Sequence, residues 1–92
     1  YQTAQTLKEL MRNNVVTKYG DKNFPGLEVC AKSGTAEIGN GKSNALFTGF
    51  VDSERYPLAF IVAVEDAGYG RAVCVPILSK VLADCKLLMD HP

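Results

Sequence analysis

Residues 58–64 read Leu-Ala-Phe-Ile-Val-Ala-Val, an apolar run between Pro57 and Glu65. Short runs rich in β-branched and aromatic side chains are typical of strands. A strand with one face in water alternates apolar and polar residues, but this one is apolar throughout. The run therefore predicts a strand that other elements cover on both faces, with a neighbouring strand on each edge. We expect the chain to form the end of a larger α/β or α+β architecture.

Two amphipathic helices are expected at the two ends of the chain. Gly20 is placed to end the first helix, and Thr3 or Thr6 to begin it, Thr6 as part of a capping box with Glu9. The second is expected to begin within residues 72–76, with Pro76 in its first turn. Each has an apolar stripe at helical spacing: Leu7, Leu10, Met11 and Val15 in the first, and Ile77, Leu78, Val81, Leu82, Cys85, Leu88 and Met89 in the second.

Two further strands are expected between these helices, at 27–32 and 44–51. Residues 38–43, with two glycines and an asparagine, predict a turn between them, and residues 52–57 predict a polar hairpin connection. The fold class is therefore α+β, with a three-stranded antiparallel sheet flanked by N- and C-terminal helices. Ninety-two residues make at most one domain.

Composition excludes several classes of protein. The chain is 47% apolar and 22% charged, as expected of a globular protein, and ten basic residues balance ten acidic ones. No basic stripe is present for nucleic acid, and no polybasic patch for a membrane surface. The three cysteines, Cys30, Cys74 and Cys85, form no CxxC pair, and His91 is the single histidine. We expect three buried, inert thiols, no structural metal and no cofactor.

The residues Lys32-Ser33-Gly34-Thr35 close the first predicted strand and suit an anion. Alternation along the strand places the hydroxyls of Ser33 and Thr35 on one face and Lys32 on the other. Gly34 removes a side chain where a ligand can lie against the backbone. Such an edge suits a carboxylate, although the same four residues also make an ordinary turn.

The surroundings of this motif resemble the end of the class B penicillin-binding protein transpeptidases. The resemblance lies in Val29-Cys-Ala-Lys-Ser-Gly-Thr-Ala-Glu-Ile38, then Leu46-Phe-Thr-Gly-Phe-Val51, then Leu58-Ala-Phe-Ile-Val-Ala-Val-Glu65. In that family a Lys-[Ser/Thr]-Gly strand, a Phe-[Thr/Val]-Gly-Phe strand and a last strand follow one another and lead into a C-terminal helix. The resemblance predicts that residues 1–92 are a C-terminal fragment of a transpeptidase domain.

The resemblance implies a role for each residue of the motif. Lys32 would set the electrostatics around a serine nucleophile and help to shuttle its proton, which makes it catalytic. Ser33 and Thr35 would bind the carboxylate of a peptidoglycan stem peptide or of a β-lactam, with Gly34 allowing close approach. The backbone N–H of Thr35 would form half of the oxyanion hole, often worth about 3 kcal/mol. The whole enzyme would crosslink stem peptides through a serine acyl-enzyme, without a metal or cofactor.

Two of the three motifs of this family are absent from the sequence. It contains neither the nucleophilic Ser-x-x-Lys nor the Ser-x-Asn element. Loss of the nucleophile removes most of the rate of a serine enzyme, so the chain alone is predicted to be inactive. The alternatives are a non-catalytic interaction or structural fragment, the sensor domain of a β-lactam receptor, and a serine β-lactamase. Glu37 and the strand after it favour the transpeptidase.

The resemblance also implies partners and a location. In the family the last strand pairs with an N-terminal strand that this chain lacks, so residues 58–64 would form an exposed apolar edge. The chain is predicted to associate with the missing N-terminal part of the domain, or to form a homodimer through that edge. The parent would face the outside of a bacterial cell membrane, anchored outside this segment.

A competing motif and several weaker candidates complete the sequence. Residues 36–43 read A-x-x-x-x-G-K-S, a permissive phosphate-binding loop, but that function requires a helix to start at Lys42, and the residues that follow favour a strand. Arg71, near the start of the last helix, is a candidate for adding positive charge to the site. Glu65 and Asp66, which follow the third strand, are expected to be a solvated carboxylate pair. Packing beside turns accounts for three tyrosines: Tyr19, Tyr56 and Tyr69.

Overall fold

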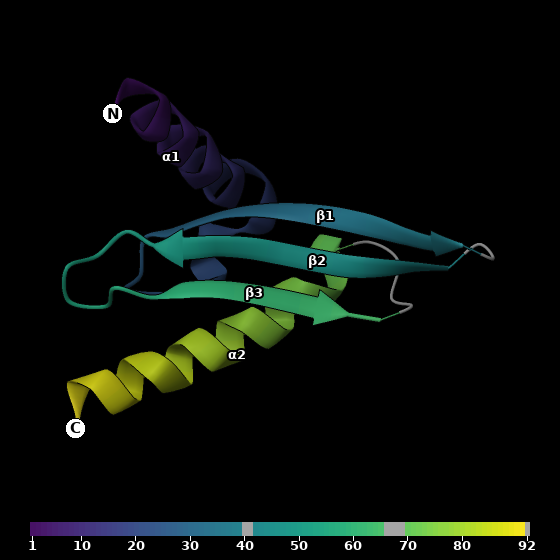
Figure 1. Cartoon of the computed structure of the whole chain (residues 1–92). Coiled ribbons are helices and arrows are strands. Elements are labelled where there is room, and N and C mark those ends of the chain that lie inside the picture. Colours follow the sequence, from purple (N-terminus) through teal and green to yellow (C-terminus); the bar gives the residue numbers. More distant parts are fainter. Residues whose placement is uncertain (40–41, 66–69, 92) are drawn as a thin grey trace.

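A computed structural model describes residues 1–39, 42–65 and 70–91 and contains a three-stranded antiparallel sheet with a helix at each end of the chain (Figure 1). The elements in chain order are α1 (Gln2–Asn14), η1 (Val15–Tyr19), η2 (Asp21–Asn23), β1 (Val29–Gly39), β2 (Lys42–Val51), β3 (Ala59–Val64) and α2 (Gly70–Asp90). The α+β prediction, with the sheet flanked by the two terminal helices, is confirmed.

Helix α1 continues into η1, a single π turn that the sequence pattern did not predict. The Gly20 N–H donates to the Val15 carbonyl at 2.9 Å, and Gly20, at a φ of 91°, ends the helix as predicted. The wider turn carries Val15 and Tyr19 into the core. The capping-box prediction is wrong because the helix already begins at Gln2, and the Thr6 hydroxyl donates to the carbonyl of Gln2 inside it.

The sheet has the order β1-β2-β3, so β1 and β3 run parallel to each other on either side of β2. β1 is longer than the predicted 27–32, because antiparallel pairing with β2 extends to Gly39 across an irregularity after Glu37. The Lys-Ser-Gly-Thr motif therefore lies inside a strand and does not close it. The phosphate-binding-loop alternative is excluded, since Lys42 begins a strand where that loop requires a helix.

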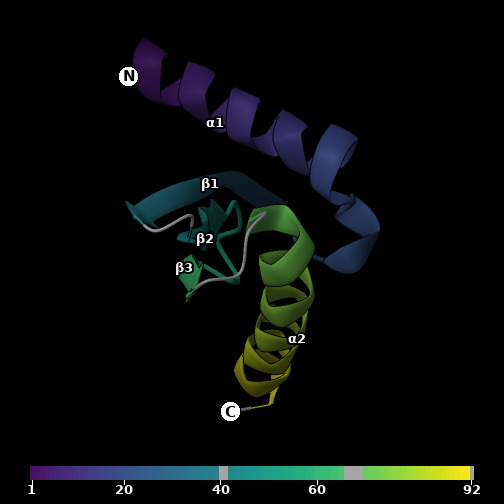
Figure 2. The same ribbon diagram turned by 90° about the vertical axis from the view of Figure 1, so that its right-hand side faces the viewer.

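Helix α2 covers one face of the sheet, and the core lies between them (Figure 2). Phe47 of β2 is fully buried at its centre, in edge-on contact with Tyr19 at 4.9 Å between ring centroids. α2 begins earlier than predicted, so Pro76 lies inside the helix and not in its first turn. The lost N–H bond is tolerated because buried residues on both sides of the proline, Cys74 and Leu78, hold the helix against the sheet.

The face of β3 that points away from α2 is uncovered among the described residues. Burial alternates along the strand, and Ile61 is 73% exposed although every residue of the strand is apolar. β3 also pairs with β2 alone, so its second edge carries no described strand. The cover that the apolar sequence predicts is thus present on one face and one edge only.

The connection between β2 and β3 is tied to the last turn of α2 by Asp90. Its carboxylate accepts hydrogen bonds from the Tyr56 hydroxyl at 2.5 Å, from Arg55 at 2.9 Å and from Lys86 at 3.2 Å. These partners, the tyrosine hydroxyl first, lower the pKa of Asp90 from 3.8 to about 2. The charge cluster therefore joins the connection between β2 and β3 to the C-terminal end of α2.

All three cysteines are free thiols. Cys30 and Cys74 are buried, and burial raises the pKa of both, whereas Cys85 is partly exposed, which corrects the expectation that all three are buried. Among the described residues, no helix is both long and apolar enough to cross a membrane. The same residues bring together no group of metal-ligating side chains.

Candidate functional site

The motif lies on β1, an edge strand whose backbone groups alternate between β2 and the outside. Asp52, next to β2, donates its N–H to the Glu28 carbonyl, which places the even-numbered residues of β1 on the β2 side. The odd-numbered residues, among them Ser33 and Thr35, therefore point their N–H and C=O groups away from the sheet. This outward edge is where an extended ligand could pair.

Side chains of α1 cover the first part of this outward edge. Arg12 donates to the Val29 carbonyl at 2.8 Å and is held there by a two-bond ion pair with Asp21, which raises the pKa of the guanidinium. Asn14 donates to the Ala31 carbonyl at 3.1 Å. In Figure 2 α1 runs across β1. The Arg12 and Asn14 side chains bond the outward carbonyls of β1, where a neighbouring strand would otherwise pair.

Tyr19 continues the cover as far as the motif. Its hydroxyl accepts the Ser33 N–H at 2.9 Å and lies 3.0 Å from the Ser33 Oγ. Tyr19 packs beside a turn, as expected, and its buried hydroxyl finds both of its partners in the motif. No sequence spacing signals this contact, since it depends on the π turn of η1.

Lys32 reaches the same edge from the opposite face of the strand. Its side chain starts on the face opposite Ser33, as predicted, but its ammonium turns back and donates to the Ser33 carbonyl at 2.6 Å. Both outward backbone groups of Ser33 are thus occupied, and a positive charge stands beside the edge. Lys32 is exposed, so this charge is open to an approaching anion.

Thr35 carries the first open groups beyond this cover. It is exposed, and within residues 1–39, 42–65 and 70–91 nothing bonds its outward N–H or C=O. The edge of β1 is therefore covered up to Ser33 and open from Thr35. The motif thus carries two hydroxyls, an ammonium and a free N–H within four consecutive residues at this boundary, a set suited to a carboxylate or another anion.

Gly34, at the same boundary, has no structural need to be glycine in the described chain. A Cβ built there meets only the Leu46 Cβ, at the ordinary distance of 3.9 Å. Gly49 of β2 differs, because a Cβ there would fall on the Cys30 carbonyl oxygen and lie 2.9 Å from the Phe60 ring. Gly34 therefore leaves space for something outside the described chain, whereas Gly49 serves the packing of the sheet.

Of the remaining sequence candidates, those whose side chains the structure describes contribute nothing further to the site. Glu65 is exposed at the end of β3, and the side chains of Asp66, Tyr69 and Arg71 lie outside the described residues. Tyr56 lies in the connection between β2 and β3 and bonds Asp90. The site thus rests on four motif residues and on Tyr19.

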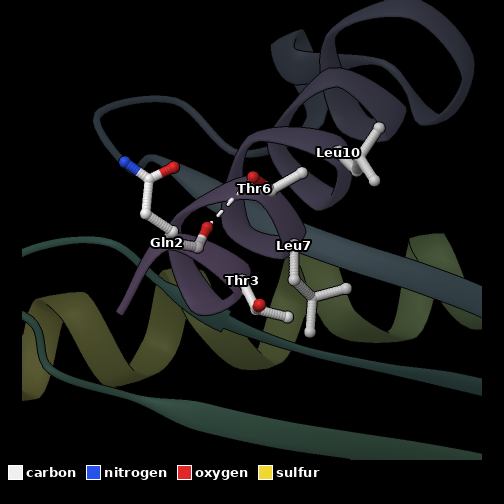
Figure 3. A pocket seen from close by; sticks show the side chains of 5 residues that line it. All are labelled: Gln2, Thr3, Thr6, Leu7 and Leu10. Carbon is white, nitrogen blue, oxygen red and sulfur yellow. Dashed lines mark hydrogen bonds between the residues drawn. The ribbon is translucent and has the colours of Figure 1, made fainter.

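An open groove on α1 offers no competing chemistry (Figure 3). Its lining has two apolar and three polar side chains: Leu7, Leu10, Gln2, Thr3 and Thr6. The Thr6 hydroxyl is already bonded to the helix backbone at 3.0 Å, and the lining contains no titratable side chain. The groove therefore exposes apolar surface without a reactive group.

Comparison with known proteins identifies the family of the chain. Residues 1–83 match the family described as the penicillin binding protein transpeptidase domain. Among solved structures, the transpeptidase domain of the FtsI4 D,D-transpeptidase from Legionella pneumophila has the same fold, with a TM-score of 0.75 and 24% identity. The match covers 94% of this chain and 35% of that one, so the chain spans about a third of the length of that domain. No curated protein matches. The chain belongs to the penicillin-binding protein transpeptidase domain family.

Proposed function

We propose that this chain supplies one wall of the active site of a D,D-transpeptidase that crosslinks peptidoglycan stem peptides and is inhibited by β-lactams. One observation carries the proposal: the edge of β1 is covered up to Ser33 and open from Thr35, beside the ammonium of Lys32. An extended peptide can add to a free strand edge through its backbone. The open groups of Thr35 offer it the first position.

This geometry supports a role for each residue of the motif. The substrate carboxylate binds the hydroxyls of Ser33 and Thr35, in the field of Lys32. The outward N–H of Thr35 points to the position of the scissile carbonyl and donates to the oxyanion as it forms. Gly34 keeps the strand free of a side chain where the ligand approaches. Lys32 also favours the ionised form of the serine nucleophile, and it helps to shuttle the proton by giving one of its own protons to the leaving group and receiving the proton of the serine in return.

The nucleophile must come from another part of the transpeptidase domain. The sequence contains no Ser-x-x-Lys and no Ser-x-Asn, and the chain spans about a third of the related domain. The uncovered face of β3 and the apolar side chains exposed on α1, Leu7 and Leu10, are surfaces that such a part could cover. We place the complete protein at the extracytoplasmic face of a bacterial membrane, among the class B transpeptidases, with no metal or cofactor.

Labelling with a fluorescent penicillin tests the role of the motif. In a complete transpeptidase domain that carries this chain, Lys32→Ala is expected to slow acylation by about 100-fold, because it removes the charge beside the nucleophile. Lys80→Ala is the matched control, since Lys80 is an exposed lysine on α2 far along the chain from the motif. Equal labelling of the two variants would contradict the proposed role of Lys32.

A second candidate function is association without catalysis. The 73% exposure of Ile61 and the unpaired edge of β3 favour it, since a flat apolar edge is a template for another strand. The partner would be the rest of the domain or a second copy of this chain. Light scattering at increasing concentration is the test, and a chain that stays monomeric at high concentration would remove the homodimer.

A further inference from the structure

We infer that Tyr19 is a positioning residue of the transpeptidase site: its hydroxyl links the N–H of Ser33 to the Ser33 hydroxyl and directs the proton of that hydroxyl toward the ligand. The inference rests on the proposed function, in which Ser33 donates to a carboxylate. It is carried by two contacts, the Ser33 N–H to Tyr19 Oη at 2.9 Å and Tyr19 Oη to Ser33 Oγ at 3.0 Å.

The donor and acceptor count gives the chain of bonds a direction. A phenol has one proton and two lone pairs, and a backbone N–H can only donate. The Tyr19 oxygen therefore accepts from the N–H of Ser33, and among the described residues the one partner left for its own proton is Ser33 Oγ. The proton of the Ser33 hydroxyl then remains for a third group. A carboxylate can only accept, so it selects this direction when it approaches.

Packing holds Tyr19 in place for this task. Its ring is 8% exposed and stands edge-on against Phe47, which is the cross-strand partner of Ser33. The π turn and Gly20 fix the backbone on both sides. Because the buried ring is held in place, the Ser33 hydroxyl keeps the Tyr19 hydroxyl as a neighbour at 3.0 Å when the ligand approaches.

Tyr19→Phe tests the inference because it removes one oxygen and keeps the ring. Tyr56→Phe is the matched control, since Tyr56 is also buried and also loses a hydroxyl bond, to Asp90. Both variants are made in the complete transpeptidase domain that carries this chain. Stopped-flow acylation by a fluorescent penicillin is resolved into the dissociation constant of the first complex and the rate constant of acylation.

A selective loss of carboxylate binding is the expected result. Tyr19→Phe raises the dissociation constant roughly tenfold and changes the acylation rate constant by less than about twofold, because the lost interaction holds ground state and transition state alike. Tyr56→Phe leaves both constants near those of the wild type. With the methyl ester of the same penicillin, which lacks the carboxylate, the wild type and Tyr19→Phe bind equally.

The outcomes separate the inference from the proposed function. A wild-type domain that is not acylated overturns the proposed function, and the inference with it. If the wild-type domain is acylated, two results overturn the inference alone. In one, Tyr19→Phe weakens binding of the methyl ester as much as binding of the penicillin. In the other, Tyr19→Phe behaves as Tyr56→Phe does. If Tyr19→Phe does not fold, amide hydrogen exchange of the wild type decides: the Ser33 N–H exchanges at least about tenfold more slowly than that of Thr35, and equal rates contradict the contact.

Discussion

Two glycines of the sheet, Gly34 and Gly49, are predicted to respond in opposite ways to the same change. In Gly49→Ala the new Cβ meets backbone, the Cys30 carbonyl and the Ala31 Cα, as well as the Phe60 ring. Backbone in a paired sheet cannot give way, so we expect a loss of about 3 kcal/mol in the free energy of unfolding. In Gly34→Ala the nearest atom is the Leu46 Cβ at 3.9 Å.

Gly34→Ala is therefore expected to keep the free energy of unfolding within about 1 kcal/mol of the wild type, with any change toward greater stability, because alanine restricts the unfolded chain. Its effect falls on function: acylation by penicillin slows roughly tenfold or more, because the methyl group stands where the ligand approaches β1. Urea unfolding followed by circular dichroism, together with gel-based penicillin labelling, measures both quantities on the complete domain.

The two variants control for each other, because each makes the same chemical change on a neighbouring strand. The reasoning is refuted if Gly34→Ala unfolds as easily as Gly49→Ala, since Gly34 would then have a structural role that the described packing lacks. It is also refuted if Gly34→Ala labels at the wild-type rate, since the space at Gly34 would then have no ligand to admit.

Three further predictions concern the packing of the fold. The pKa of the Asp90 carboxylate is lowered to about 2, so its contribution to stability is complete above about pH 4 and is lost as the pH falls toward 2. Asp90→Asn should therefore flatten the dependence of the urea midpoint on pH across that range. Arg12→Met leaves the Val29 carbonyl and Asp21 without their donor, and should lower the free energy of unfolding in urea by about 1–3 kcal/mol. An unchanged urea midpoint would mean that water replaces the guanidinium. Ile61→Lys places a charge on the uncovered face of β3 and should reduce the self-association measured by light scattering. Equal association of wild type and variant would mean that the contact between copies does not involve this face.

The architecture was predictable because its signals are local. The apolar run of β3, the helical spacing around Leu7 and Leu82 and the helix-ending Gly20 each report the structure of their own segment, and a strand, two helices and a helix end lie in these segments. Element bounds were less predictable because they depend on partners. β1 continues through Gly34 to Gly39 since β2 supplies hydrogen bonds across that whole length, and strand propensity says little about such pairing.

The residues of the motif were predictable from the sequence, but the side chains that hydrogen-bond to its strand were not. The Lys-Ser-Gly-Thr spacing shows which side chains gather on one strand, but not that α1 crosses its edge. Arg12, Asn14 and Tyr19 are between 14 and 17 residues away from the β1 groups that they bond, and no periodicity connects them. The π turn that carries Tyr19 is a single wider turn in an otherwise helical segment, and the helical spacing of the sequence does not predict it.

The central claim is that this chain contributes the carboxylate-binding wall of a transpeptidase and not its nucleophile. The most direct measurement is labelling of the 92 residues with a fluorescent penicillin, read by denaturing gel and mass spectrometry, beside a longer protein that adds the Ser-x-x-Lys region. The account predicts no covalent adduct on the 92 residues and one adduct on the added serine of the longer protein. A stoichiometric adduct on the 92 residues alone would contradict it, and would point to Ser33 or Ser43 as a nucleophile.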